Sequence, residues 1–215
     1  MYITRPTRLM RSVFSSALWR VNTNEKKIFL TFDDGPIPEI TPWVLNTLNK
    51  FNAKATFFCV GENIHKHPLL YREIITQGHT TGNHTYNHLD GWKSKFKKYY
   101  ENILKCDQIS NNCRTNNHTI KLDQKPLFRP PYGRMSLSQY LKLKSEYSIV
   151  MWDLLSGDFD RTISMEECLQ NVLAKTRKGS IVVFHDSIKA KINLQYTLPK
   201  MLEIFSKEGF AFESI

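Results

Sequence analysis

Short apolar runs alternate along the chain with segments in which apolar residues recur at helical spacing. The runs carry apolar side chains on both faces of the backbone, which is typical of parallel strands covered on both sides. We expect strands over residues 27–32, 55–60, 127–129, 149–152, 181–184 and 210–212, a further strand leading into residue 83, and helices over 41–48, 68–77, 91–110, 136–147, 164–178 and 194–208. This alternation predicts an α/β fold with a mostly parallel sheet, either an open doubly wound sheet or a small barrel.

Local signals mark several of the expected helix ends. Thr41 directly precedes a proline, so we expect Thr41 to cap a helix that begins with that proline. Ser164 and Glu167 have the spacing of a capping box, and Gly78 stands where a left-handed residue would end a helix. The polar stretch from 111 to 125 has no periodicity and is expected to form a surface loop.

Residues 1–27 differ in pattern from the rest of the chain. Arginines surround a short apolar stretch over 13–19, which two serines interrupt. This stretch is too short to span a bilayer, and no small-residue cleavage site of a signal peptide follows it. Apolar residues at helical spacing between Met10 and Leu18 predict an amphipathic helix that packs on a domain formed by residues 28–215. The alternative is peripheral contact of this N-terminal segment with a membrane. We expect a cytoplasmic protein, with envelope association as the alternative.

Composition adds the expectation of one globular domain. The chain has 215 residues, of which 41% are hydrophobic, and this length fits a single α/β unit. The formal net charge of +10 would suit an anionic polymer, but the basic residues are dispersed and no nucleic-acid-binding module is recognisable. The cysteines form no C-x-x-C pair, so we expect ordinary buried thiols, with a Cys106–Cys113 bridge as the alternative.

Polar side chains follow the ends of several expected strands. Asp33 and Asp34 follow the first strand, His84 and Arg129 follow later ones, and His185 follows the strand over 181–184. The carboxyl ends of parallel strands share one face of a barrel, and active sites lie on that face. We therefore expect these side chains to meet.

A metal site is the first chemistry that these residues indicate. His84 and His88 are four residues apart, a spacing that lets two imidazoles bind one ion. Asp33 and Asp34 are adjacent carboxylates whose mutual repulsion a divalent cation would relieve. Two histidines and one of these carboxylates leave coordination positions open for water and substrate, which is typical of a catalytic site, while the other carboxylate remains free as a base.

Two further segments carry groups suited to an acyl-transfer reaction. After Arg129, two prolines stiffen the backbone and hold the Tyr132 amide in a fixed direction, as an oxyanion hole requires. His185 has the chemistry of a general acid near neutral pH if a carboxylate positions it. Asp158 is the preferred partner, with Asp153 and Asp186 as alternatives.

These segments together resemble the metal-dependent polysaccharide deacetylases, a family that includes chitin, peptidoglycan and nodulation-type chitooligosaccharide deacetylases. The motifs that carry the resemblance are residues 31–36, 84–88, 129–133, 152–159 and 181–185. The resemblance implies a distorted (β/α) barrel of about seven parallel strands with outer helices. Two departures are Val183, where the family often has leucine, and Phe159, where it more often has tryptophan or tyrosine.

The resemblance also implies a role for each residue. Asp34, His84 and His88 are the metal ligands, usually of Zn2+, although other divalent transition metals are alternatives. Asp33 is the base that activates water, and Arg129 orients it. The Tyr132 amide stabilises the oxyanion, and His185, positioned by Asp158, protonates the leaving amine.

The predicted function is the removal of N-acetyl groups from a glycan that contains N-acetylglucosamine, with release of acetate. The glycan would be a peptidoglycan fragment or a chitooligosaccharide, and the enzyme a monomer that binds no nucleic acid. One alternative is a deacylase of the same chemistry that acts on a lipid-linked sugar, O-acetylated xylan or a small N-acyl compound. Another, of a different class, is an inactive glycan-binding barrel.

Overall fold

The computed structural model describes residues 4–114 and 125–215, which form one α/β unit. Its strands are β1 (Lys27–Asp33), β2 (Thr56–Cys59), β3 (Thr80–Asn83), β4 (Leu127–Phe128), β5 (Ser148–Ile149), β6 (Leu154–Leu155), β7 (Ile181–His185) and β8 (Ala211–Glu213). Its helices are α1 (Arg8–Val13), α2 (Thr41–Lys50), α3 (Gly61–Lys66), α4 (Pro68–Thr76), α5 (Phe96–Cys113), α6 (Leu137–Leu143), α7 (Met165–Lys175) and α8 (Lys191–Lys207), with short 3-10 turns η1 (Gly91–Lys93) and η2 (Pro131–Gly133).

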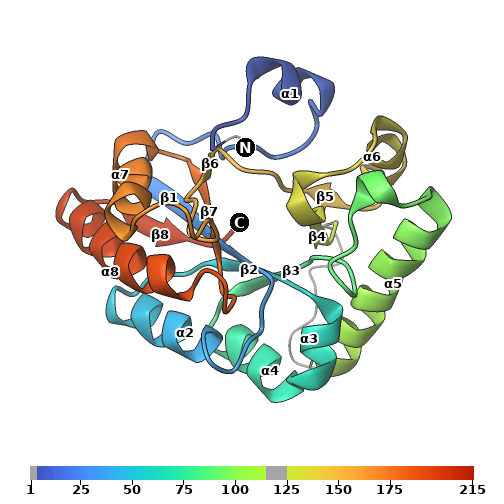
Figure 1. The fold of residues 1–215 in the computed structure, drawn as a ribbon, viewed down its shortest axis with the longest axis horizontal. Helices are drawn as coiled ribbons and strands as arrows, with labels where there is room; N and C mark the ends of the chain where they lie inside the picture. The colour runs from blue at the N-terminus through green and yellow to red at the C-terminus, as the bar shows by residue number, and fades with distance from the viewer. Residues whose placement is uncertain (1–3, 115–124) are drawn as a thin grey trace.

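The sheet runs in the order β5-β4-β3-β2-β1-β7-β6, and every pairing along it is parallel. The short C-terminal strand β8 lies off this path and pairs with the beginning of β1. Figure 1 shows the strands in the centre and the helices around their outside. The predicted barrel of about seven parallel strands with outer helices is therefore confirmed, and of the two arrangements left open by periodicity the barrel is the correct one.

The central strands of the sheet carry buried side chains on both faces. Residues 28–33 of β1 are all buried, as the unbroken apolar run predicted. Phe32 stacks on Phe57 of β2 and on Phe184 of β7, with ring centroids 5.0 and 6.0 Å apart. Because three adjacent strands contribute these rings at one level, the centre of the sheet is rigid just below the strand ends.

The N-terminal segment fills the gap between the two edge strands β5 and β6. Leu18 pairs in parallel with Val150, accepting from the Met151 amide and donating to the Ile149 carbonyl, both at 2.8 Å. Nearer the N-terminus, the Thr4 carbonyl accepts a hydrogen bond of 2.8 Å from the amide at the second residue of β6. The segment thus supplies backbone partners to strands that the main sheet leaves unpaired.

The helix expected between residues 10 and 18 is shorter than predicted. It ends at Val13, and none of its residues is buried. Beyond it, Ser16 is held through its amide and hydroxyl by the Tyr140 hydroxyl, both at 2.7 Å, and the Trp19 indole donates to the Phe14 carbonyl. These contacts, with Tyr140 of the domain and within the segment itself, replace the helical hydrogen bonds that spacing alone predicted.

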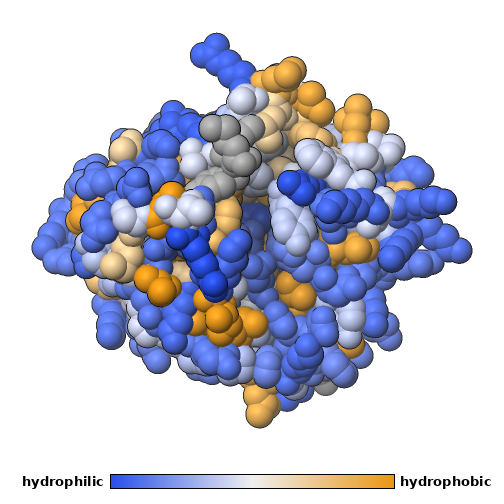
Figure 2. Space-filling view, in the orientation of Figure 1, coloured by the Kyte–Doolittle hydropathy of each residue, from blue (hydrophilic) through white to orange (hydrophobic). Residues whose placement is uncertain are grey.

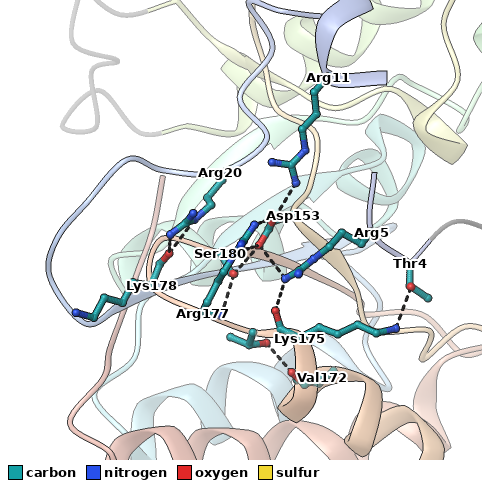
Figure 3. Close-up of polar contacts among 11 residues, drawn as sticks. Thr4, Arg5, Arg11, Arg20, Asp153, Val172, Lys175, Arg177, Lys178 and Ser180 are labelled. Atoms are coloured by element: carbon teal, nitrogen blue, oxygen red, sulfur yellow. Dashed lines mark hydrogen bonds and ion pairs between the residues drawn. The ribbon is translucent and has the colours of Figure 1, made fainter. Parts of the chain in front are cut away.

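A buried carboxylate ties the N-terminal segment to the end of the barrel opposite the strand C-termini. Asp153, which precedes β6, is fully buried and accepts hydrogen bonds of 2.7 Å from Arg11 and from Ser180. Arg5 and Arg177 approach the same carboxylate at 3.4 and 3.3 Å. Figure 3 shows the three arginines converging on it from the N-terminal segment and from the loop that precedes β7. Burial raises the pKa of Asp153, but the bonds from Ser180, Arg11 and Arg177 outweigh burial and lower it overall.

Other element boundaries also depart from the sequence predictions. Thr41 is not the helix cap, because its hydroxyl accepts from the Ile37 amide and donates to Asp186, so the cap position falls to Ile40. The capping box of Ser164 and Glu167 is present as predicted. The expected helix over 91–110 divides into η1 and α5, and α3 was not predicted. Of the loop expected over 111–125, residues 111–113 are helical and residues 115–124 lie outside the described residues.

The cysteines and the surface of the protein can be compared with what composition predicted. All four cysteines are free and buried, so the alternative of a Cys106–Cys113 bridge is wrong. Within residues 4–114 and 125–215, no helix combines the length and the apolar character needed to cross a bilayer. Figure 2 shows a largely hydrophilic face with apolar side chains gathered at the top over α1, where Leu9 is 73% exposed.

Candidate active site

The parallel register brings the polar strand ends to one edge of the sheet, as predicted. Asp33, the last residue of β1, lies beside Phe58 of β2 on one side and beside His185 of β7 on the other. Asn83, which precedes His84, lies beside the last residue of β4. Because neighbouring strands end at the same level, side chains from distant parts of the chain meet within a few ångströms.

Asp34, His84 and His88 form a cluster with the composition of a metal site. One ligand atom from each lies within 4.8 Å of the other two. Oδ1 of Asp34 is 3.2 Å from Nε2 of His88 and 3.9 Å from Nε2 of His84. This oxygen is buried and has no hydrogen-bond partner among the described residues. Burial favours the neutral acid, but the close His88 and the charges of His185 and His84 hold the pKa of Asp34 well below its usual range.

The tautomer of His84 is also the one that a metal ligand requires. Nδ1 of His84 lies 2.8 Å from the Arg129 carbonyl oxygen. A carbonyl can only accept, so Nδ1 carries the proton and Nε2 presents its lone pair to Asp34 and His88. Burial lowers the pKa of His84 to about 4, against the opposing charge of Asp33, so the ring is neutral at physiological pH. A neutral imidazole beside an ionised carboxylate whose Oδ1 accepts no hydrogen bond is a donor set that a divalent cation fits.

The loop that carries the two histidines is held by residues that the sequence reasoning missed. Asn83 accepts from the Thr85 amide at 2.7 Å and donates to Asp107 of α5, also at 2.7 Å. Asp107 in turn accepts from the Tyr147 hydroxyl at 2.6 Å. Thr85 and His88 both have positive φ, at 62° and 56°, a conformation that persists only where surrounding contacts enforce it. Asn83 next to a histidine at a strand end was the signal available for finding this support.

Arg129 holds the second carboxylate, Asp33. Its Nη1 donates to Asp33 Oδ1 and to the Thr31 hydroxyl, both at 2.7 Å. The guanidinium is almost fully buried, lies 4.1 Å from the centroid of the Phe58 ring, and donates from its other nitrogens to the carbonyls of Val150 and Met151. Burial lowers the pKa of Arg129, while the Asp33 charge opposes that shift. Asp33 is therefore fixed through one oxygen.

His185 pairs with Asp158, and neither alternative carboxylate touches its ring. Nδ1 of His185 is 2.8 Å from Asp158 Oδ1, and its backbone amide donates to Oδ2 at 2.7 Å. Burial acts to lower the pKa of His185, but the charge and hydrogen bond of Asp158, with the charges of Asp34 and Asp33, raise it to about 9. Asp153 lies at the opposite end of the barrel in the arginine cluster described above.

Asp186 holds the turn that follows Asp34, a role that the sequence did not predict. It is fully buried, and its oxygens accept from the Gly35 amide at 3.0 Å and the Thr41 hydroxyl at 2.5 Å. A Cβ on Gly35 would lie 1.9 Å from this carboxylate, so only glycine fits. The contact fixes the turn directly after Asp34, and Asn63 donates at 2.7 Å to the Asp34 carbonyl from the other side.

Tyr132 lies at the rim of the site on the stiff turn η2. Its φ of 59° turns the backbone sharply, and Gly133 follows with a φ of 64°. A Cβ on Gly133 would lie 2.3 Å from the Trp152 ring, so the turn packs directly on that indole. Tyr132 is 60% exposed, and the centroid of its ring lies 4.5 Å from that of the His88 ring. Its amide donates to no acceptor within the described ranges, 4–114 and 125–215.

The fold and this site together define a class of protein. It is an α/β barrel whose strand ends bear a metal-type cluster, beside a carboxylate held by arginine and a histidine held by aspartate. The family model described as polysaccharide deacetylase matches residues 20–149. A peptidoglycan-N-acetylglucosamine deacetylase of Bacillus cereus is 32% identical over 200 residues, covering 92% of this chain and 90% of the relative. The chain therefore belongs to the polysaccharide deacetylase family.

Two further similarities support this membership. A chitooligosaccharide deacetylase of Azorhizobium caulinodans is 32% identical over 171 residues, which cover 78% of this chain and 77% of that protein. The crystal structure of the Bc1960 peptidoglycan N-acetylglucosamine deacetylase, in complex with a naphthalenyl N-oxidanyl-benzamide, superposes with a TM-score of 0.85 at 29% identity. That superposition covers 98% of this chain and 95% of the other.

Proposed function

We propose that this protein is a zinc-dependent N-deacetylase of glycans that contain N-acetylglucosamine, with peptidoglycan fragments as the preferred substrate. The observation that carries the proposal is the cluster of Asp34, His84 and His88 within 4.8 Å. Beside it, Asp33 and His185 occupy adjacent positions on β1 and β7, each with a charged partner of its own. The choice of peptidoglycan as substrate is supported by relatives of similar length that are named as peptidoglycan-N-acetylglucosamine deacetylases.

The three ligands would hold the metal with two imidazole nitrogens and one carboxylate oxygen, a set that suits zinc. When bound, a zinc ion supplies Lewis acidity that polarises the acetyl carbonyl and lowers the pKa of water. Asp34 is the anionic ligand, since its oxygen is buried without a hydrogen-bond donor. His84 contributes Nε2, because its Nδ1 is committed to the Arg129 carbonyl.

Asp33 acts as the general base of the reaction. Arg129 holds its Oδ1 at 2.7 Å, so the other oxygen is left to accept the proton of the attacking water. The different surroundings of the two adjacent carboxylates support different roles: Asp34 faces the histidines, whereas Asp33 faces the buried arginine. Water adds to the acetyl carbon, and its proton passes to Asp33.

His185 completes the hydrolysis as the general acid. With a pKa raised to about 9, the ring is protonated at neutral pH and can give its Nε2 proton to the amide nitrogen as the C–N bond breaks. Asp158 keeps Nδ1 occupied and orients the ring. The Tyr132 amide stabilises the negative charge that develops on the acetyl oxygen. The products are acetate and a free amino sugar.

Substrate class is tested by measuring acetate release from zinc-loaded protein on three substrates in parallel. These are a peptidoglycan fragment, a chitin oligomer of equal length and O-acetylated xylan. The proposal expects release from both amide substrates, with the higher kcat/KM on peptidoglycan. Release from O-acetylated xylan alone, by protein shown to bind zinc, would overturn the N-deacetylase assignment and favour the ester-cleaving alternative.

A further inference from the structure

A row of flat side chains leads away from the metal-type cluster on the surface. The Tyr132 ring lies against His88, with the Arg134 guanidinium 5.6 Å from the Tyr132 ring centroid. The same guanidinium lies 5.2 Å from the ring of Trp92, in η1. Tyr132 is 60% exposed and Trp92 67% exposed. Large aromatic rings that stay this open beside an active site need a reason, because their hydration is unfavourable.

The Trp92 indole is exposed but fixed in place. Its Nε1–H donates to the Met135 carbonyl at 3.1 Å, and its backbone amide donates to Asp90 Oδ1 at 2.9 Å. One turn of backbone is thereby locked, so the ring presents a flat face to solvent in a single orientation. A ring held in this way loses little conformational entropy when a ligand covers it.

The loop beneath Trp92 is fastened to the segment after Tyr132. Gln139 of α6 donates to the carbonyls of Gly91 and Ser94 at 2.9 and 3.0 Å. A Cβ on Gly91 would lie 2.4 Å from the Arg134 carbonyl oxygen, so the two segments are in direct backbone contact. The row of Tyr132, Arg134 and Trp92 is therefore a rigid surface that is continuous with the metal-ligand loop.

We infer that this row is a subsite for the sugar adjacent to the one that is deacetylated, in a glycan that carries a carboxylate. The inference rests on the proposed function and adds a binding site to it. The C–H face of a pyranose ring packs on an aromatic face, whose π-electrons attract the C–H dipoles. Trp92 supplies that face at the far end of the row, separated from His88 by Tyr132 and Arg134.

Arg134 supplies the preference for an acidic glycan. Its guanidinium lies between the two aromatic rings, and its side chain is 42% exposed. One nitrogen pairs with Asp90 at 3.1 Å, and a guanidinium has five N–H donors, so donors remain for a second carboxylate. In peptidoglycan the sugar next to each N-acetylglucosamine carries a lactyl ether, whose carboxyl group is a free carboxylate where the peptide stem has been removed. Where the stem is present, that carboxyl is amide-linked to a peptide that bears carboxylates of its own, whereas chitin bears none. The subsite thus favours the first glycan over the second.

The test compares Trp92→Ala, Trp92→Phe and the wild type on a peptidoglycan tetrasaccharide and on a single N-acetylated sugar. Trp92→Ala is expected to raise KM for the tetrasaccharide about 10-fold with kcat unchanged, a loss of about 1.4 kcal/mol of binding. The single sugar would occupy only the position beside the metal ligands, so its KM is expected to show no change. Trp92→Phe keeps an aromatic face and is expected to retain most of the affinity. An unchanged tetrasaccharide KM in an active Trp92→Ala enzyme would overturn the subsite while leaving the deacetylase function intact.

Arg134→Gln and Arg134→Lys test the charge preference. The glutamine variant is expected to raise KM for the peptidoglycan tetrasaccharide several-fold and to leave KM for a chitin tetramer unchanged, whereas the lysine variant recovers part of the loss. Equal effects on both glycans would overturn the carboxylate preference. Calorimetric titration of the peptidoglycan tetrasaccharide into Asp33→Asn, with and without Trp92→Ala, measures the subsite without turnover. Equal affinity of the two proteins would refute the subsite whether or not the wild type proves to be a deacetylase.

Discussion

Replacement of Asp158 by asparagine isolates the reason why His185 can serve as an acid. The substitution removes the negative charge 2.8 Å from Nδ1 and preserves the size of the side chain and one acceptor oxygen. Asp158 is fully buried, so no water takes over its role. With that charge absent, burial, which acts to lower the pKa of His185, is opposed only by the more distant Asp34 and Asp33. We therefore expect the pKa of His185 to fall from about 9 to its ordinary 6.5 or below.

The size of the effect follows from the protonated fraction. At pH 8, a group with a pKa of about 9 is roughly 90% protonated, whereas one with a pKa of about 6.5 is roughly 3% protonated. Turnover at pH 8 should therefore drop about 30-fold, and the difference should nearly vanish at about pH 6, where both forms are mostly protonated. A bound cation lowers the pKa of His185 in both the variant and the wild type. The quantity to measure is therefore the difference between their two pH profiles on the alkaline side.

The assay is the pH dependence of kcat for acetate release by zinc-loaded protein between about pH 5.5 and 9.5. Asp153→Asn is the matched control, because it removes a buried carboxylate at the opposite end of the barrel and should leave the pH profile in place. A variant of Asp158 that loses activity equally at every pH would refute the acid role that we assign to the pair. A loss confined to the alkaline side supports it.

The remaining predictions concern the metal, the base and the N-terminal anchor. Asp33→Asn should retain zinc and lose turnover by a factor of about 10²–10⁴, whereas His88→Ala should lose both turnover and zinc. Equal zinc content in the two inactive variants, measured by atomic spectroscopy, would contradict the division of roles between base and ligand. Asp153→Asn should lower the free energy of unfolding by about 2 kcal/mol at neutral pH, since it loses a charge-assisted bond from Arg11 but strands no buried cation. That loss corresponds to a melting temperature about 4–8 °C lower, and calorimetry showing an unchanged midpoint would refute the anchor. Because the pKa of Asp153 is lowered in the fold, its contribution is complete above the unfolded-state pKa of about 3.9 and is lost as pH falls through the folded value.

Residues placed by strand register were predictable from the sequence. Asp33 and His185 each end an apolar run, and parallel pairing makes them neighbours wherever those runs form adjacent strands. The spacing of His84 and His88 likewise needs only a local turn to bring both rings to one ion. The positions of these residues follow from short-range patterns, and a single sequence is enough to reveal such patterns.

Residues placed by tertiary contacts were not predictable in the same way. Thr41 has the sequence context of a helix cap, but its hydroxyl is used by Asp186, 145 residues away. The N-terminal helix ends early because Ser16 bonds to the Tyr140 hydroxyl, 124 residues away, instead of continuing the helix. The sequence favoured Asp158 as the partner of His185 but left Asp153 and Asp186 open, and only the folded chain excludes them by pairing His185 with Asp158, 27 residues away. Long-range hydrogen bonds of this kind override local propensity.

The most direct test of the central claim is a titration of metal-stripped protein with zinc while acetate release from a peptidoglycan fragment is followed. We expect activity to rise in proportion to zinc and to saturate at one ion per chain, and we expect His84→Ala neither to bind the ion nor to gain activity. Full activity in the stripped protein, or saturation with zinc bound in His84→Ala, would contradict the assignment of Asp34, His84 and His88 as the site at which hydrolysis occurs.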